Sequence, residues 1–237
     1  MTKSDLAGAY AKIEWADRHI DMLVGEIEDF GKRDPFLLAG ESHPEGTLYR
    51  FCVEEDIPAS ISVEIGMILA ALRSSLDVLA VTLAARNGYP DSKTTYFPYA
   101  GNAESFGNRA FRRKIRDLSD PDQKSSTDLK TYPEGNATFA ALHNLNLTDK
   151  HRGLVATGAF VGSSAIEGAG ILQLIALYPG PYIHGSPVAL WKVKGNLELR
   201  IAVGISFAEI PDLGRPPVIE TLRSFRALAY SYVEMFG

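Results

Sequence analysis

The chain is poor in cysteine and histidine, and each shortage removes a class of site. Its 237 residues include 1 cysteine, Cys52, so it can form neither an internal disulfide nor a cysteine-rich zinc centre. Its 5 histidines are scattered without the spacing of metal ligands. We therefore expect a cytoplasmic protein with no metal and no cofactor.

Several sequence signatures are missing as well. The opening "MTKSDLAGAYAKIEW" is polar and mixed, which argues against a secretory signal. No uncharged apolar run approaches the roughly 18 to 20 residues that cross a bilayer, so we expect no membrane contact. The absence of a "GxxxxGK" loop, a nucleophile elbow and a dinucleotide fingerprint sets those enzyme classes aside.

Positive charge is scarce except in the middle of the chain. The net charge is -5, but residues 61–160 contain 12 Lys and Arg against 10 Asp and Glu. Much of this excess comes from "NRAFRRKIR", which holds Arg109, Arg112, Arg113, Lys114 and Arg116. The run is typical of a solvated helix face, and binding of an anion is the alternative. Phe111 is the one aromatic residue interleaved with these cations.

What is present is a chain of 46% hydrophobic residues with clear helical periodicity. Apolar residues recur every three or four positions over residues 6–30, 61–83 and 218–236, which predicts three long helices. The second is apolar on both sides, with Met67, Val78 and Val81 opposite the main seam, and is expected at the centre. Shorter helices are expected within 104–118 and 137–147, and an extended stretch over "TTYFPYA".

Strand-like runs rich in β-branched and aromatic residues follow at 154–161, 171–178, 189–193 and 197–207. A further strand is expected at "LYRFCVEE". The pattern predicts an α+β protein in which a helical bundle carries an inserted antiparallel sheet. We expect a single domain over residues 1–237, with a helical core formed by 1–150 and 216–237 and a sheet-rich insertion at about 151–210.

Two charged residues interrupt the apolar central helix. Arg73 and Asp77 lie four positions apart in "LRSSLDVL" and so share one helix face. Burying an unpaired ion costs roughly several kcal/mol of folding free energy, so a mutual ion pair is the favoured interpretation. The alternative is that one or both also bind a ligand or meet the next cluster.

That cluster lies in "LHNLNLTDKHRGLVATG". His151 could exchange a proton near neutral pH with Asp149 orienting it, while Lys150 and Arg152 could hold an anion. In an extended segment Asp149 and His151 would point one way and the two cations the other. The favoured interpretation is a structured helix-to-strand junction, with ligand binding and catalysis as alternatives.

These motifs together resemble a group of uncharacterised bacterial proteins. In that group a helix of the type "GDxLHNLRSALDHLA" precedes a short "FP" segment and an "LxxLNxxDKHR" element. The matching strings here are "LRSSLDVLAVTLA", "TYFPY" and "LHNLNLTDKHRGL". The resemblance covers most of the chain but implies no particular activity.

The group's helix is itself similar to HEPN domains, many of which are metal-independent ribonucleases. Their signature is an arginine followed, after four to six residues, by a histidine. Arg73 matches that arginine, but Val78 occupies the histidine position. Upstream, Met67, Ala70 and Ala71 replace the group's Asp, His and Asn. The resemblance therefore implies a helical scaffold rather than the ribonuclease mechanism.

We expect a non-catalytic or degenerate HEPN-like binding or scaffold protein. Its partner could be a protein, a nucleotide or RNA, and Arg73, Asp77, Lys150 and Arg152 are the candidate ligand-binding residues. The alternative is a nuclease or phosphoester hydrolase in which His151 acts with Arg73, Lys150 or Arg152. HEPN modules commonly dimerise, so a homodimer is compatible with both.

Overall fold

The computed structural model describes residues 5–152, 157–161, 173–177, 183–192, 203–207, 210 and 213–237. Within these ranges, side chains are not described for residues 150–152, 157, 159–161, 173–177 and 203. The described residues form six helices: α1 (Ala7–Gly31), α2 (Ala59–Arg86), α3 (Arg109–Ile115), α4 (Asp120–Asp128), α5 (Ala137–Arg152) and α6 (Val218–Met235). They also form six strands: β1 (Phe36–His43), β2 (Gly46–Val53), β3 (Thr157–Val161), β4 (Gln173–Leu177), β5 (Pro187–Lys192) and β6 (Val203–Phe207). The predicted α+β class is thus confirmed.

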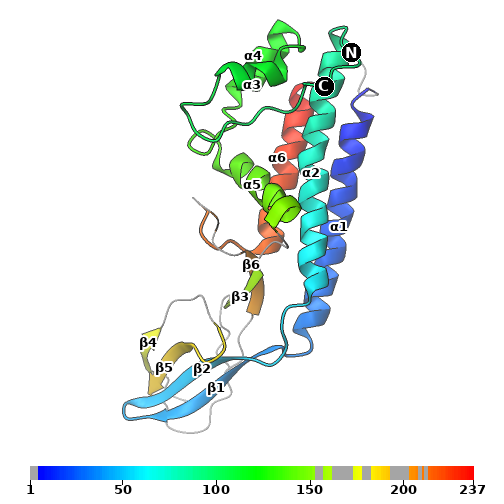
Figure 1. The fold of residues 1–237 in the computed structure, drawn as a ribbon. Helices are drawn as coiled ribbons and strands as arrows, with labels where there is room; N and C mark the ends of the chain where they lie inside the picture. The colour runs from blue at the N-terminus through cyan, green and yellow to red at the C-terminus, as the bar shows by residue number, and fades with distance from the viewer. Residues whose placement is uncertain are drawn as a thin grey trace.

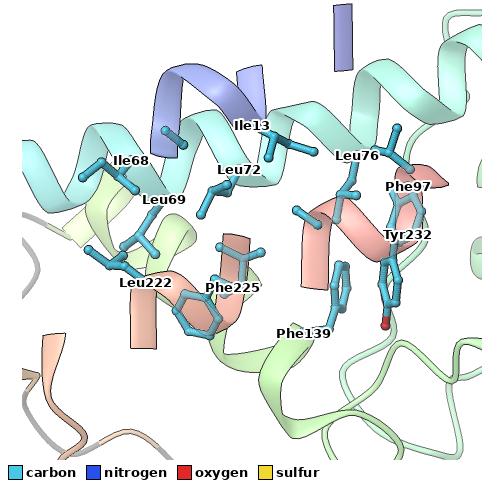
Figure 2. Close-up of a cluster of buried hydrophobic side chains, with 14 of the residues drawn as sticks. Ile13, Ile68, Leu69, Leu72, Leu76, Phe97, Phe139, Leu222, Phe225 and Tyr232 are labelled. Carbon is cyan, nitrogen blue, oxygen red and sulfur yellow. The ribbon is translucent and has the colours of Figure 1, made fainter. Parts of the chain in front are cut away.

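The three long helices α1, α2 and α6 lie side by side as a bundle (Figure 1). Each buries the apolar face that its periodicity predicts, and Ile13, Leu72 and Phe225 bring the three faces together (Figure 2). Helix α5 crosses α2 and α6 and adds Phe139 to the same core. The shared core explains why these helices, with their exposed polar faces, form one body.

Helix α2 occupies the central position that its two-sided hydrophobicity predicted, since it packs on α1, α5 and α6. Coverage is incomplete, because Met67 and Val81 on the side opposite the main seam are exposed. By length and composition α2 could span a membrane, although Arg73 and Asp77 interrupt its apolar residues. However, 56% of its apolar window is buried inside the protein, which is consistent with the core helix of a soluble protein.

The short helices begin at polar caps. The Asn108 side chain accepts a hydrogen bond from the Phe111 backbone N–H at 2.9 Å and so begins α3. Ser119 caps α4, which has a proline in its first turn. Helix α4 was not predicted, because its sequence "DPDQKSSTD" buries little more than Ser126 and carries no apolar period.

The strands form two antiparallel sheets rather than the one expected. The larger has the order β1-β2-β5-β4, and the smaller pairs β3 with β6. The hairpin β1-β2 lies within residues 1–150, the expected helical core, and its strand β2 (Gly46–Val53) overlaps the further strand expected at "LYRFCVEE". Its alternate residues Tyr49 and Phe51 are buried, and β2 pairs directly with β5. The larger sheet lies at the opposite end of the bundle from α3 and α4 (Figure 1).

Candidate functional site

Arg73 on α2 is the centre of a buried polar cluster. Its side chain is 8% exposed, and its Nη1 donates to Asp77 Oδ1 at 2.8 Å. This confirms the favoured prediction that the two residues pair with each other. The Arg73 guanidinium makes two more hydrogen bonds, from Nε to His143 Nδ1 at 3.2 Å and from Nη2 to the Phe97 carbonyl at 3.0 Å. These hydrogen bonds offset the free-energy cost of burying the Arg73 charge.

The Arg73–Asp77 pair also holds the extended segment that follows α2. The Asp77 Oδ1 accepts a hydrogen bond from the Phe97 N–H at 3.0 Å, while Arg73 binds the carbonyl of the same residue. Both backbone groups of Phe97 are therefore held by one ion pair. The Phe97 ring is buried, and Figure 2 shows it beside Tyr232 of α6, with ring centroids 5.7 Å apart.

His143 of α5 completes the cluster from a third element. Its ring stacks on Tyr99 with centroids 3.9 Å apart and an interplanar angle of 26°. The Arg73 guanidinium lies over the Phe139 ring, 5.7 Å from its centroid, which adds a cation–π contact. An arginine and an imidazole thus meet at hydrogen-bond distance although Val78 occupies the expected histidine position on α2.

The cations of α3 project away from a buried apolar side. Phe111 and Ile115 point into the core, and Phe111 packs edgewise on Phe106 with centroids 4.7 Å apart. Phe111 is therefore unavailable as a stacking platform. The basic side chains occupy the remaining helix surface, where Arg109, Arg112 and Arg113 are exposed.

Helix α3 and the segment before Phe97 form the walls of an open basic groove of about 1130 Å³. Its lining contains six cations and no acidic residue: Lys93, Arg109, Arg112, Arg113, Lys114 and Arg116, together with Thr94, Tyr96, Asn108 and Ala110. Tyr96 and Lys114 join the two walls, because the Tyr96 N–H donates to the Lys114 carbonyl at 3.3 Å. The run "NRAFRRKIR" is thus one wall of a concave surface and not merely a solvated helix face.

Among the described residues, most of the groove's cations have no ion-pair partner. Arg116 lies 3.3 Å from Asp117, whereas Lys93, Arg109 and Arg113 form no ion pair with any residue in the described part of the chain. Closely spaced cations without counter-charges repel one another, and an anion would relieve that repulsion.

Lys114 links the groove to the buried cluster. Its Nζ donates to the Tyr99 carbonyl at 2.9 Å. Burial lowers the pKa of Lys114 below its usual value, and the nearby Arg73 charge lowers it further, although Asp77 opposes this effect. The groove and the Arg73–Asp77 pair therefore both contact the same segment, residues 96–99.

The "DKHR" residues form the last turn of α5. Four residues separate the end of α5 from Thr157, where β3 begins. The "DKHR" residues are helical rather than extended, and the connection from α5 to β3, residues 153–156, lies outside the described residues. Successive helical side chains diverge by roughly 100°, so Asp149 and His151 do not share a face. Asp149 lies against α2, since a Cβ atom added to Gly66 would be 2.2 Å from Asp149 Oδ1.

The side chains of Lys150, His151 and Arg152 lie outside the described residues, so their site role stays a prediction. Along α5, His151 is eight residues beyond His143, a rise of about 12 Å. It is His143 that contacts Arg73. Sequence reasoning missed His143, Lys93 and Tyr96 because no local pattern connects them to Arg73 or to α3.

Comparison with known proteins finds no matching family model, and no curated protein and no solved structure is significantly similar to the chain.

Proposed function

We propose that this chain is a non-catalytic binding protein whose basic groove holds a phosphate-bearing ligand. The observation that carries the proposal is the groove itself, which has six cationic residues and no acidic residue in its lining. Phosphate oxygens are the usual partners of such arginine clusters, because guanidinium groups bind them in a bidentate manner. A cytoplasmic location, where such ligands are abundant, fits the single cysteine.

The groove's basic lining, more than its size, distinguishes it from pockets for compact small molecules. Pockets for compact small molecules generally enclose about 300 to 1000 Å³ and are mostly apolar. This one is larger and basic, at about 1130 Å³. Exposed Arg109 and Arg113 lie four residues apart and so occupy one face of α3, where a chain of phosphates could contact both.

A binding role also fits the state of Arg73. Its guanidinium is buried and donates to three protein groups, Asp77, His143 and Phe97. Its side chain is 8% exposed, so little of it is accessible to a phosphate from solvent. The HEPN-like resemblance is thus best interpreted as a degenerate helical scaffold in which the matching arginine has a structural role.

A nuclease or phosphoester hydrolase remains the second candidate because of one contact. The 3.2 Å hydrogen bond between Arg73 Nε and His143 Nδ1 brings an imidazole to the matching arginine. His143 would then supply the acid or base that the sequence suggested for His151. In this reading phosphate would bind beside Arg73 and His143, with Lys114 contributing positive charge.

Binding of inorganic polyphosphate, measured by titration calorimetry at low salt, tests the leading proposal. Arg109→Gln/Arg113→Gln removes two cations that have no ion-pair partner among the described residues, so the fold should persist. We expect its affinity to fall by about tenfold or more, because two phosphate contacts are lost. The dependence of its affinity on salt concentration should weaken as well. Lys12→Gln/Arg18→Gln on α1 makes the same charge change outside the groove and should leave affinity within about twofold.

Two results would contradict the binding proposal. One is equal loss of affinity in the α1 control, which would reduce the effect to net charge. The other is cleavage of RNA by the pure protein that His143→Gln abolishes while binding persists, which would establish the enzyme. His151→Gln in the same assay distinguishes the two histidines.

A further inference from the structure

The basic groove contains one exposed aromatic ring. Tyr96 is 53% exposed and lines the groove together with the cations of α3. An exposed aromatic side chain in a cationic groove is not needed for phosphate binding alone. It is the feature that distinguishes sites for unpaired bases, whose flat faces stack on aromatic rings.

The position of Tyr96 is fixed on both sides along the chain. Before it, Thr95 is buried and its hydroxyl lies 2.7 Å from that of Ser92. After it, the Phe97 backbone is held by Arg73 and Asp77. The ring is thus presented by an anchored backbone, which lowers the entropy cost of stacking on it.

We infer that the groove binds single-stranded nucleic acid, with an unpaired base stacked on Tyr96 and the adjoining phosphates on the cations of α3. This inference rests on the proposed function and names the ligand class of the same groove. The phosphates provide sequence-independent affinity, and the ring provides a preference for bases that are free to stack.

The arrangement disfavours two other phosphate-bearing ligands. A duplex presents its bases stacked on one another, so a ring such as Tyr96 could be used only after a base is unstacked at a cost of a few kcal/mol, roughly. A polyphosphate chain has no base and would gain nothing from Tyr96. The two ligands therefore serve as probes that isolate the contribution of the ring.

The experiment is fluorescence anisotropy with labelled oligouridylate of about 12 nucleotides, competed by a duplex of the same length and by inorganic polyphosphate. Wild type should bind the single strand at least about fivefold more tightly than the duplex. Tyr96→Leu should weaken single-strand binding by about tenfold, the usual effect of losing one stacked base, and leave polyphosphate binding unchanged.

Matched variants separate stacking from general damage. Tyr96→Phe keeps the ring and should retain wild-type affinity. Tyr89→Leu removes an aromatic side chain that is 52% exposed but does not line the groove, and should also bind normally. Circular dichroism of each variant checks that the helical fold persists.

The possible results are distinguishable. Equal binding of single strand and polyphosphate, both insensitive to Tyr96→Leu, would overturn the inference and leave the proposed phosphate site standing. Tighter binding of the duplex, again independent of Tyr96, would overturn it in the same way. Failure of all three probes to bind would overturn both this inference and the proposed function.

Discussion

Replacing Arg73 by methionine should destabilise the protein strongly although it preserves much of the side-chain volume. The change removes three hydrogen bonds, to Asp77, His143 and the buried Phe97 carbonyl. Breaking a fully buried ion pair costs about 3 to 5 kcal/mol, and a hydrogen bond to a charged group contributes about 1.5 to 3 kcal/mol. These are alternative descriptions of overlapping contacts and are not summed.

The exposure of Asp77 places the expected loss near the lower end of that range. Its side chain is 35% exposed and can be rehydrated when Arg73 is removed. The Phe97 carbonyl has no such recourse, because Phe97 is buried between α2 and α6. We therefore expect the free energy of unfolding to fall by about 3 kcal/mol, a large share of the stability of a typical domain.

Urea unfolding followed by circular dichroism gives this value. With a denaturant slope of about 1 to 3 kcal/mol per molar, the midpoint should fall by at least about 1 M. Arg18→Met on the exposed face of α1 should change stability by less than about 0.5 kcal/mol. In Arg73→Met/Asp77→Leu both charges are gone, so its loss should be smaller than the sum of the single losses. Additive losses, or an effect no larger than that of Arg18→Met, would refute the conclusion that the Arg73–Asp77 pair stabilises the fold.

Three further predictions concern packing and titration. Gly66→Ala should cost about 1 to 2 kcal/mol, because its new Cβ would be 2.2 Å from Asp149 Oδ1, and the penalty should vanish in an Asp149→Ala background. Burial raises the pKa of Tyr232 from 10.0 to about 12, partly opposed by a hydrogen bond from Asn136. The unfolded chain then loses this proton first, so wild type should lose about 2 kcal/mol between pH 10 and 12 relative to Tyr232→Phe, measured by urea unfolding at each pH. For Lys114 the sign is reversed: its pKa is lowered by burial, so the unfolded chain holds the proton longer. Unfolding free energies should therefore rise for wild type relative to Lys114→Met as the pH approaches 10.5.

The long helices could be predicted because each buries a continuous apolar face along its length. In α1 and α6 every apolar position that recurs at three or four residues reaches the shared core. The hairpin β1-β2 was harder, since the exposed residues of β1 carry little apolar alternation and the strand is defined by its pairing with β2. Pairing of β2 with β5 joins segments more than 130 residues apart, which no local pattern encodes.

The candidate site was predictable only where its contacts are local. Arg73 and Asp77 are one helical turn apart, so their pairing followed from spacing. His143 meets Arg73 from a separate helix 70 positions along the chain, and the spacing of histidines gave no sign of it. Tyr96 was also missed as a groove residue, because the interleaved Phe111 was the aromatic residue in view and it proved to be buried.

The contacts around Arg73 also explain why the motifs "LRSSLDVL", "TYFPY" and "LHNLN" occur together in one chain. Each supplies one part of the hydrogen-bonded cluster around Arg73: the ion pair from α2, the Phe97 backbone from the extended segment and His143 from α5. This cluster positions Tyr96 without exposing Arg73 to ligand. This makes Asp77→Asn decisive between the two functions. If phosphate binds in the groove, the variant should bind polyphosphate within about twofold of wild type, since Asp77 does not line that surface. If phosphate instead binds beside Arg73 and His143, removing the carboxylate that competes for Arg73 Nη1 should strengthen binding by about tenfold, the effect of one unit-charge repulsion at partly buried sites.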